Sequence, residues 1–351
     1  MNCGSSKRSR AGGSVLVLVL IVVSTLTILS VGLAYRMRIE MKLAWSNARR
    51  TQSYYLALGG VERIKALLSQ EELSPGVIAR ICQFSGTAEE EQLFEQLQAP
   101  DETARRFLTY SLRDEQGYLN VNKSDPASWE KLEILSRECR AGILDWIDKD
   151  GDTNPEGAET DFYERLAPPY ICKDGPCVAL KELLYSKGVT YSMYTGEDLN
   201  RNSFLDENEK DGLDRMPADN EDNTLEMGLV DIFTVCGEGK ININTAPGVV
   251  LAALPGLDAS VAEVILGRRC GPDGKPGTED DVGIAGAEEI ASVEGLTQQQ
   301  AELLQQYCGF DSECFRIFSC AGSPDAPECC LMATVRYTED GSRILSLERL
   351  L

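Results

Sequence analysis

An uncharged apolar run near the N-terminus limits the fold and the location of this chain more than any other feature. From Ser14 to Tyr35 the sequence contains no charged residue and no proline. A helix needs about 20 apolar residues to cross a bilayer, so this run is long enough to span a membrane. Lys7, Arg8 and Arg10 precede it. This charge placement predicts that the N-terminus stays in the cytoplasm and that the rest of the chain lies on the outer side.

The run is too long for an ordinary signal peptide, whose apolar core has about 7–15 residues before a small-x-small cleavage site. Gly32-Leu33-Ala34 has the composition of such a site, but a helical pattern continues beyond it. Apolar residues recur at steps of three and four, and the next proline is Pro75. The recurring positions are Tyr54, Leu58, Val61, Ile64 and Leu68. We therefore predict one helix over residues 14–73, about 90 Å long at ~1.5 Å per residue, apolar on all sides at first and amphipathic at its end.

A short basic leader that ends in glycine before a long apolar helix resembles the type IV pilins and the pseudopilins of type II secretion. The resemblance implies that a prepilin peptidase cuts between Gly13 and Ser14 and that the new N-terminus is methylated. It also implies that the helix anchors the protein and later forms the core of a filament. Most of the family carries a glutamate at the fifth mature position, where this chain has Leu18. That departure points to the GspK family of minor pseudopilins and implies a place at the filament tip, where no subunit lies above.

The remaining sequence predicts an α+β fold. "GYLNVN" (117–122) and "KININ" (240–244) alternate apolar and polar residues as strands do, and "CFRIFSC", "CLMATVRYT" and "RILSLERLL" predict three C-terminal strands. Residues 76–113 are predicted as helix and loop. Residues 245–307 predict two helix pairs in which Thr245 and Thr297 are N-caps. We expect a pilin-like body, in which the long helix packs on a small antiparallel sheet. A large, mostly helical inserted domain with helix-hairpin-helix (SAM-like) units interrupts this body.

The predicted boundaries follow from these elements. They are 1–13 for the leader, 14–35 for the transmembrane helix, 36–122 for the rest of the helix and the first part of the body, 123–309 for the insertion with calcium loops, and 310–351 for the C-terminal strands. "DWID" (145–148) and "ININTAPGVVLAALPGL" (241–257) are further motifs of the GspK family. The resemblance therefore covers most of the chain.

The amino-acid composition limits the partners and ligands that this chain can bind. The formal charge is −22 and histidine is absent. An acidic chain is repelled by nucleic acid and by anionic lipid but attracts divalent cations. The absence of histidine removes the commonest general base and the usual zinc ligand. The twelve cysteines form no CxxC pair, so disulfides in an oxidising compartment fit better than zinc, above all between Cys308 and Cys330. The connectivity stays open, and scattered buried thiols are the alternative.

The segment "DLNRNSFLDENE" (198–209) has the spacing of a twelve-residue calcium loop. Such a loop surrounds a hard cation with oxygens from positions 1, 3, 5, 7, 9 and 12. Leu205 at position 8 fits an apolar anchor, whereas Ser203 replaces the usual glycine at position 6. The alternative is an acidic surface loop. The candidate ligands are Asp198, Asn200, Asn202, the Phe204 carbonyl, Asp206 and Glu209.

Two further acidic loops are weaker candidates. "DWIDKDGDTN" lacks a glutamate at position 12, and calcium binding and helix capping are equally open there; Asp145 fits a structural role. Its candidate ligands are Asp148, Asp150 and Asp152, with Asn154 next and Glu159 nearby. In "GPDGKPGTEDD", turn chemistry accounts for most of the sequence. Its acids are Asp273, Asp280 and Asp281.

Two other function classes find little support. Without histidine, no residue is available to activate a serine or cysteine nucleophile in the usual way, so we expect no enzyme. The "PGL" helix pair ends in Arg268 and Arg269, and helix-hairpin-helix modules with basic neighbours bind DNA. The strong negative charge opposes phosphate binding, so protein–protein packing is the better interpretation.

The resemblance implies a minor pseudopilin of the type II secretion system that sits at the tip of the periplasmic pseudopilus and helps to initiate its assembly. It would be a single-pass protein of the bacterial inner membrane with its body in the periplasm. Its partners would be other minor pseudopilins and the prepilin peptidase, with cargo or secretin as further contacts, and its cofactor would be calcium. The alternative is a calcium-dependent periplasmic or surface adhesion protein on an uncleaved anchor. A DNA-uptake protein is a third hypothesis.

Overall fold

The computed structural model describes residues 12–70, 77–78, 82, 107–198, 210, 222, 224–274, 278, 280–323, 326–338 and 341–350. The chain divides into two compact units, Met1–Ser53 and Tyr54–Leu351. The helix α1 (Gly12–Gln70) contributes to both. Its bounds lie within three residues of the predicted ones, so the long uninterrupted helix is confirmed.

The first unit is the apolar part of α1. Its large apolar side chains, from Val15 to Leu43, are exposed. Ser24, Thr25 and Thr27 bond within the helix: for example, Ser24 Oγ donates to the Leu20 carbonyl at 2.7 Å and Thr27 Oγ1 to the Val23 carbonyl at 2.7 Å. Because the hydroxyls bond to the preceding turn, the helix needs no outside partner for them in an apolar medium.

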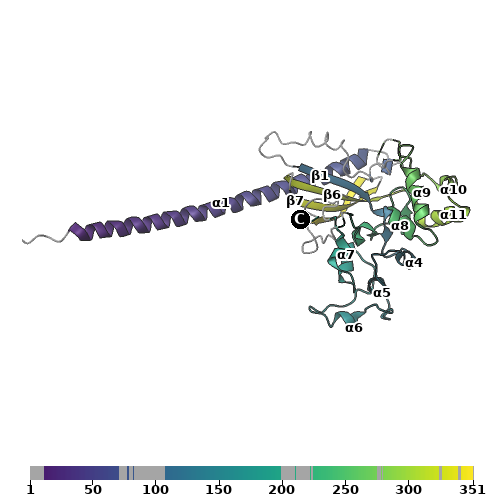
Figure 1. Cartoon of the computed structure of the whole chain (residues 1–351), viewed down its shortest axis with the longest axis horizontal. Coiled ribbons are helices and arrows are strands. Elements are labelled where there is room, and N and C mark those ends of the chain that lie inside the picture. The colour runs from purple at the N-terminus through teal and green to yellow at the C-terminus, as the bar shows by residue number, and fades with distance from the viewer. Residues whose placement is uncertain are drawn as a thin grey trace, which may run out of the picture. The chain divides into compact units, whose positions relative to one another are not determined.

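The second unit contains a four-stranded antiparallel sheet in the order β1-β6-β7-β8, of which Figure 1 labels β1, β6 and β7. The strands are β1 (Phe107–Asp114), β6 (Cys314–Ser323), β7 (Ala326–Thr338) and β8 (Gly341–Arg349). The three C-terminal strands were predicted. β1 was not: the prediction of helix and loop up to residue 113 is wrong from Phe107 onward. The alternation of apolar and polar residues over 108–113 is the signal for a strand, but it lies in the same segment as the acidic "EEEQLFEQL" (89–97), which favours helix.

The end of α1 packs on this sheet. Val61, Ile64 and Leu68 are nearly or fully buried and form one core with residues of β1, β6 and β7. The sheet side of that core is Leu112, Phe315, Ile317, Ala333 and Val335. Steps of three and four place the helix residues on one face. The predicted amphipathic stripe and the α+β fold are therefore confirmed in the second unit.

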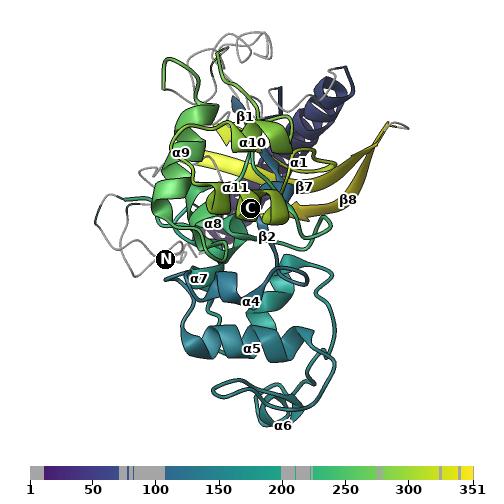
Figure 2. The same ribbon diagram turned by 90° about the vertical axis from the view of Figure 1, so that its right-hand side faces the viewer.

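The chain between β1 and β6 forms the insertion and has its own core, which includes Trp129, Tyr163 and Phe233. Figure 2 shows α4, α5 and α6 in one lobe and α8 to α11 in another. Its elements are η2 (Glu115–Gly117), β2 (Leu119–Asn120), α4 (Pro126–Trp129), α5 (Arg137–Ile147), α6 (Thr160–Tyr163), η3 (Leu180–Tyr185), α7 (Tyr191–Thr195), η4 (Leu229–Asp231), β3 (Phe233–Thr234), β4 (Ile241–Asn242), α8 (Gly248–Ala253), α9 (Ala259–Arg269), α10 (Ala287–Ala291), α11 (Gln298–Tyr307) and β5 (Cys308–Gly309).

The two predicted helix pairs are α8 with α9 and α10 with α11. Thr297 caps α11, because its hydroxyl accepts the Gln300 backbone N–H. The expected capping role of Thr245 is wrong: Pro247 occupies the N-cap position of α8. The Thr245 hydroxyl instead donates to Asp114 Oδ2 at 2.6 Å and so links the helical insertion to the end of β1.

The two asparagine motifs form short strands that play matching parts. β2 pairs with β3 and β4 with β5, both in parallel. In each motif the second asparagine clamps a distant backbone with both ends of its amide. Asn122 does this to Cys177 at 2.7 and 3.0 Å, and Asn244 to Ile284 at 2.6 and 2.9 Å. Each side-chain amide therefore holds a distant loop against the motif with two hydrogen bonds, as a neighbouring strand would.

A buried polar network joins the insertion to the sheet. Arg316 on β6 donates to both carboxylate oxygens of Glu115, at 2.6 and 2.8 Å, and to the Val230 carbonyl at 2.6 Å. Thr234 also donates to Glu115. Next to this pair, burial raises the pKa of Asp114 to about 6, although several hydrogen bonds act in the opposite direction. Buried charges of this kind need full pairing, which fixes how the insertion leaves the sheet.

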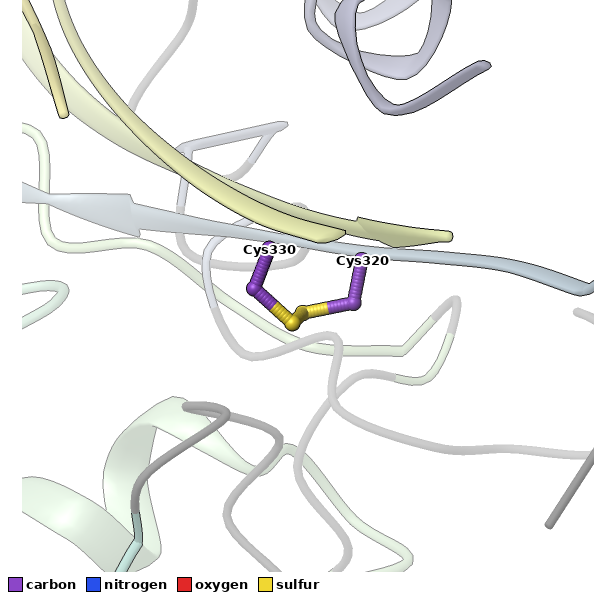
Figure 3. The surroundings of a disulfide bond; sticks show 2 residues. All are labelled: Cys320 and Cys330. Atoms are coloured by element: carbon purple, nitrogen blue, oxygen red, sulfur yellow. A yellow bond between two sulfur atoms is a disulfide. The ribbon is translucent and has the colours of Figure 1, made fainter. Parts of the chain in front are cut away.

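One disulfide lies within the sheet. Cys320 on β6 and Cys330 on β7 are directly opposite in the register, and their sulfurs are bonded (Figure 3). Both cysteines belong to the C-terminal group for which bridging was expected.

Candidate functional site

The leader junction lies at the start of α1. Gly13 and Ser14 fall in its first turn, and Leu18 follows with 64% of its surface exposed. Among the described residues, α1 is the helix whose length and apolar composition suffice to cross a membrane. A carboxylate within the apolar part of such a helix is costly unless it is paired. Leu18 carries no charge, so its burial in a membrane requires no charged partner. Cleavage and methylation stay predictions.

The three predicted ligands of the acidic loop after α5 differ in exposure and contacts. Asp150 and Asp152 are exposed, and Asp150 Oδ1 accepts the Asp152 backbone N–H at 3.0 Å. Asp148 is the C-cap residue of α5, so its carboxylate does not cap a helix N-terminus. It lies at the negative end of the helix dipole, where an anion is unfavourable. Burial raises the pKa of Asp148, and the neighbouring Asp150 and Asp145 raise it further.

Three side chains from two segments meet beside Asp148: that of Glu159, and those of Cys172 and Asp174 from a later loop. One potential ligand atom from each lies within 4.8 Å of the others. Glu159 is only 7% exposed, and its pKa is raised to about 7, first by burial and then by Asp174 and other nearby acids. Within the described part of the chain, Glu159 Oε1 and Asp148 Oδ1 are buried without a hydrogen-bond partner. We call Asp148, Glu159 and Asp174 the acidic pocket.

The donor set suits a hard cation. Carboxylate oxygens are the ligands that calcium prefers, and buried acceptors without donors are rare in folded proteins. Cys172 is a poor metal ligand here, because burial raises the pKa of its thiol to about 12 and the thiol donates to the Asp145 carbonyl at 3.6 Å. The residues present therefore fit calcium better than zinc.

Asp145, the first residue of "DWID", shapes this loop. It is completely buried, and one of its oxygens accepts the Asn154 backbone N–H at 3.2 Å. A Cβ atom on Gly157 would lie 2.1 Å from Asp145 Oδ2, so only glycine fits there. The expected structural role of Asp145 agrees with these contacts. Sequence spacing indicated Glu159 but missed Asp174 and Cys172, because they come from a later loop with no periodic relation to the first.

The stronger predicted calcium loop starts at a buried position. Asp198 is 7% exposed and follows α7. The chain is fixed just before it: the Glu197 N–H donates to the Glu226 carbonyl at 3.1 Å, and the Glu226 N–H donates to the Glu197 carboxylate at 2.9 Å. The two ends of the intervening segment are therefore held together. The other predicted ligands lie outside the described residues: Asn200, Asn202, Phe204, Asp206 and Glu209.

The third acidic loop uses its carboxylate for a turn. Asp280 accepts the Asp273 backbone N–H at 3.0 Å and the Thr278 hydroxyl at 2.6 Å. These bonds lower the pKa of Asp280. The turn-chemistry interpretation accounts for these contacts.

Arg269, at the end of α9, is turned inward. It is 1% exposed, and its Nη2 donates to the Ala246 carbonyl at 2.7 Å. Burial lowers its pKa to about 10. Of the two arginines considered for phosphate binding, only Arg268 is exposed. This placement weakens the DNA hypothesis.

One comparison with known proteins finds a family match within the insertion. Residues 130–196, which hold α5, α6 and the acidic pocket, match the family described as type II secretion system (T2SS), protein K. The chain is 24% identical over 211 residues to the type II secretion system protein K of Aeromonas hydrophila, covering 53% of this chain and 61% of that protein. The match thus spans about three fifths of the length of this relative.

A solved structure also aligns with the chain. It is the GspK-GspI-GspJ complex from the type 2 secretion system of enterotoxigenic Escherichia coli. The alignment covers 90% of this chain and 99% of that chain at 14% identity, with a TM-score of 0.47. The two sequence comparisons agree with each other and with the motifs noted above: both find this chain similar to type II secretion system protein K.

Proposed function

We propose that this chain is a minor pseudopilin of the type II secretion system. One observation carries the proposal: the protein K domain is inserted between β1 and β6 of a sheet on which the amphipathic end of α1 packs. This is the organisation that a filament subunit needs, with a helix for bundling and a folded body around the end of that helix. The inner membrane is the proposed site of the anchor, with the body in the periplasm.

The proposed position is the tip of the pseudopilus. Leu18 needs no charged partner from a subunit above it. The insertion is a bulky acidic domain that would interrupt the regular shaft of the filament. Apolar helices of other minor pseudopilins are the proposed neighbours of α1, because an exposed apolar surface this long is stabilised by packing against similar helices. Cargo or the secretin channel is the proposed contact of the insertion.

Mass spectrometry of the N-terminus, on protein from membranes that contain prepilin peptidase, tests this function. We expect a mature start at Ser14. Gly13→Asp should retain the leader, whereas the control Gly12→Ala should be processed. Coexpressed minor pseudopilins should copurify with the processed protein. An unprocessed N-terminus in the wild type, or no recovery of minor pseudopilins, would instead favour an adhesion protein on a simple anchor.

We also propose that the insertion binds calcium. The Asp198–Glu209 loop is one proposed site, supported by its spacing and by the fixed base of its segment. The acidic pocket is the other, supported by the unmatched oxygens of Asp148 and Glu159. Clustered carboxylates repel one another, so a cation that binds only the folded state stabilises it by about 2.7 kcal/mol at 100 times its dissociation constant.

Thermal unfolding with calcium and with chelator tests the two sites separately. Glu209→Ala and Glu159→Gln should each reduce the rise in Tm that calcium produces in the wild type. The control Glu164→Gln, an exposed acid next to the pocket, should leave that rise unchanged. If wild type and both variants respond equally to calcium, neither site holds the ion.

A further inference from the structure

Two cysteines from different parts of the second unit are neighbours at the junction of insertion and sheet. Cys236 follows β3 in the insertion, and Cys314 begins β6. Both are thiols in the structure, with Cys314 buried and Cys236 half-buried. The two thiols face each other closely enough to interact side chain to side chain. Two positions that are 78 residues apart in sequence have thus been brought into side-chain contact by the fold.

The flanking residues hold this contact in place. Thr234, two positions before Cys236, and Arg316, two positions after Cys314, both bond to Glu115. Cys314 and Arg316 are two apart on β6 and point to the same face, and the Cys236 N–H is bonded to Thr234. Both cysteines therefore lie next to residues that bond to Glu115. The sulfurs therefore sit on two segments that are already tied together.

The backbones of the two cysteines are fixed as well. The Cys236 carbonyl accepts from Asn120 Nδ2 at 2.8 Å, and the Cys236 N–H donates to Thr234 Oγ1 at 3.0 Å. The Cys314 N–H donates to Gln116 Oε1 at 3.2 Å. Little conformational freedom remains to be lost when the sulfurs join.

Arg336 supplies the positive charge that a reactive thiolate needs. The β6–β7 register places it directly opposite Cys314, and its guanidinium hydrogen-bonds the Cys314 sulfur. The hydrogen bond from Cys236, helped by Arg336, lowers the pKa of Cys314 to about 7. A thiol with a pKa near neutrality is well matched to thiol–disulfide exchange.

We propose that Cys236 and Cys314 form a second disulfide, which ties the inserted domain to the sheet of the pilin-like body. The Cys314 thiolate attacks one sulfur of a disulfide oxidant, either a protein disulfide or a small-molecule disulfide, and releases one oxidant thiolate. Cys236 then loses its proton and attacks Cys314 Sγ in the mixed disulfide, which releases the second thiolate. Two protein thiols are oxidised and one oxidant disulfide is reduced to two thiols.

In the cell this step depends on an oxidising compartment, and in that respect it rests on the proposed function. The bond would close a long loop, which is where a cross-link restricts the unfolded chain most. It would also back up the Glu115–Arg316 pair at the same junction.

The test equilibrates the full chain, purified in detergent, with oxidised and reduced glutathione, blocks free thiols by alkylation, and maps peptides without reduction. We expect Cys236 linked to Cys314 in the oxidised protein. Cys236→Ser should leave Cys314 alkylated and should lower the Tm of the oxidised protein by about 5 °C, with little effect after reduction. Cys270→Ser, which changes another half-buried thiol, is the control and should leave the linked peptide intact.

The Cys320–Cys330 bond is an internal reference. Alkylation of both Cys236 and Cys314 while the reference bond is intact would overturn the proposal, as would a link from either one to a different cysteine. If Cys236→Ser does not fold, the wild-type peptide map decides alone. Thiol trapping in intact cells separates the two proposals: a reduced reference bond there refutes the periplasmic placement, whereas the glutathione result still decides the pairing.

Discussion

Replacing Arg316 by methionine should destabilise the second unit strongly. Arg316 and Glu115 are 5% and 3% exposed, and the arginine makes two hydrogen bonds to the carboxylate and one to the Val230 carbonyl. Arg316→Met keeps a long apolar chain but leaves a buried carboxylate and a buried carbonyl without their donor. Removing one partner of a buried pair costs about 3–5 kcal/mol. At about 2 °C per kcal/mol for a unit of this size, the Tm should fall by about 6–10 °C.

A double-mutant cycle separates the pair from its surroundings. Glu115→Gln removes the charge and keeps the shape, so the double variant with Arg316→Met should be at least about 1 kcal/mol more stable than Arg316→Met alone. The control is Lys123→Met, which breaks the exposed Lys123–Glu238 pair and should cost less than about 1 kcal/mol. Urea unfolding followed by near-ultraviolet circular dichroism measures all four. Equal losses for Arg316→Met and Lys123→Met, or strict additivity in the cycle, would refute this account of the junction.

Three further changes probe the insertion. In chelator, the Tm should fall as the pH rises from about 4.5 to about 7, because folded Glu159 keeps its proton up to about 7 whereas the unfolded chain releases it near 4.5. Glu159→Gln should flatten this part of the profile. An unchanged slope in the variant would contradict the role of Glu159. Gly157→Ala should cost about 1–3 kcal/mol in urea unfolding because its Cβ meets Asp145, whereas Gly151→Ala, which meets nothing within 4 Å, should be near neutral. Asn244→Ala removes both bonds to the loop before α10 and should cost about 1–3 kcal/mol, with earlier hydrogen exchange in that loop; equal exchange in both proteins would argue against the clamp.

The sequence predicts those parts of the fold that repeat a local period. The steps of three and four from Val61 to Leu68 determine which face of α1 meets the sheet, and alternation predicts the strands after Cys314. β1 carries the same alternation from Leu108 to Arg113 but was missed, because the acidic run at 89–97 in the same segment favours helix. A local pattern therefore predicts the secondary structure correctly where neighbouring segments favour the same kind of element, and it misleads where they favour different ones.

The candidate site was less predictable, because it depends on contacts between distant segments. Asp148 and Glu159 could be found by their spacing, but Asp174 joins them only after the chain has passed α6. Thr245 shows the same limit: it stands where a helix cap is expected, yet its hydroxyl bonds to Asp114. A polar side chain takes the partner that the tertiary fold presents, and that partner has no signature in the surrounding residues.

The register at the junction has one more consequence. Asp114 at the end of β1 lies opposite Phe315 near the start of β6, so the polypeptide departs from the sheet and rejoins it on adjacent strands. A short hairpin would suffice to connect these two points. The residues between these two points therefore form an insertion in a loop of the sheet. The length and sequence of this insertion can change while the strand order stays the same. Such a layout carries a large domain between two adjacent strands without a change in strand order. A version without that domain would also need Arg316 replaced, because its partners Glu115 and Val230 belong to the insertion.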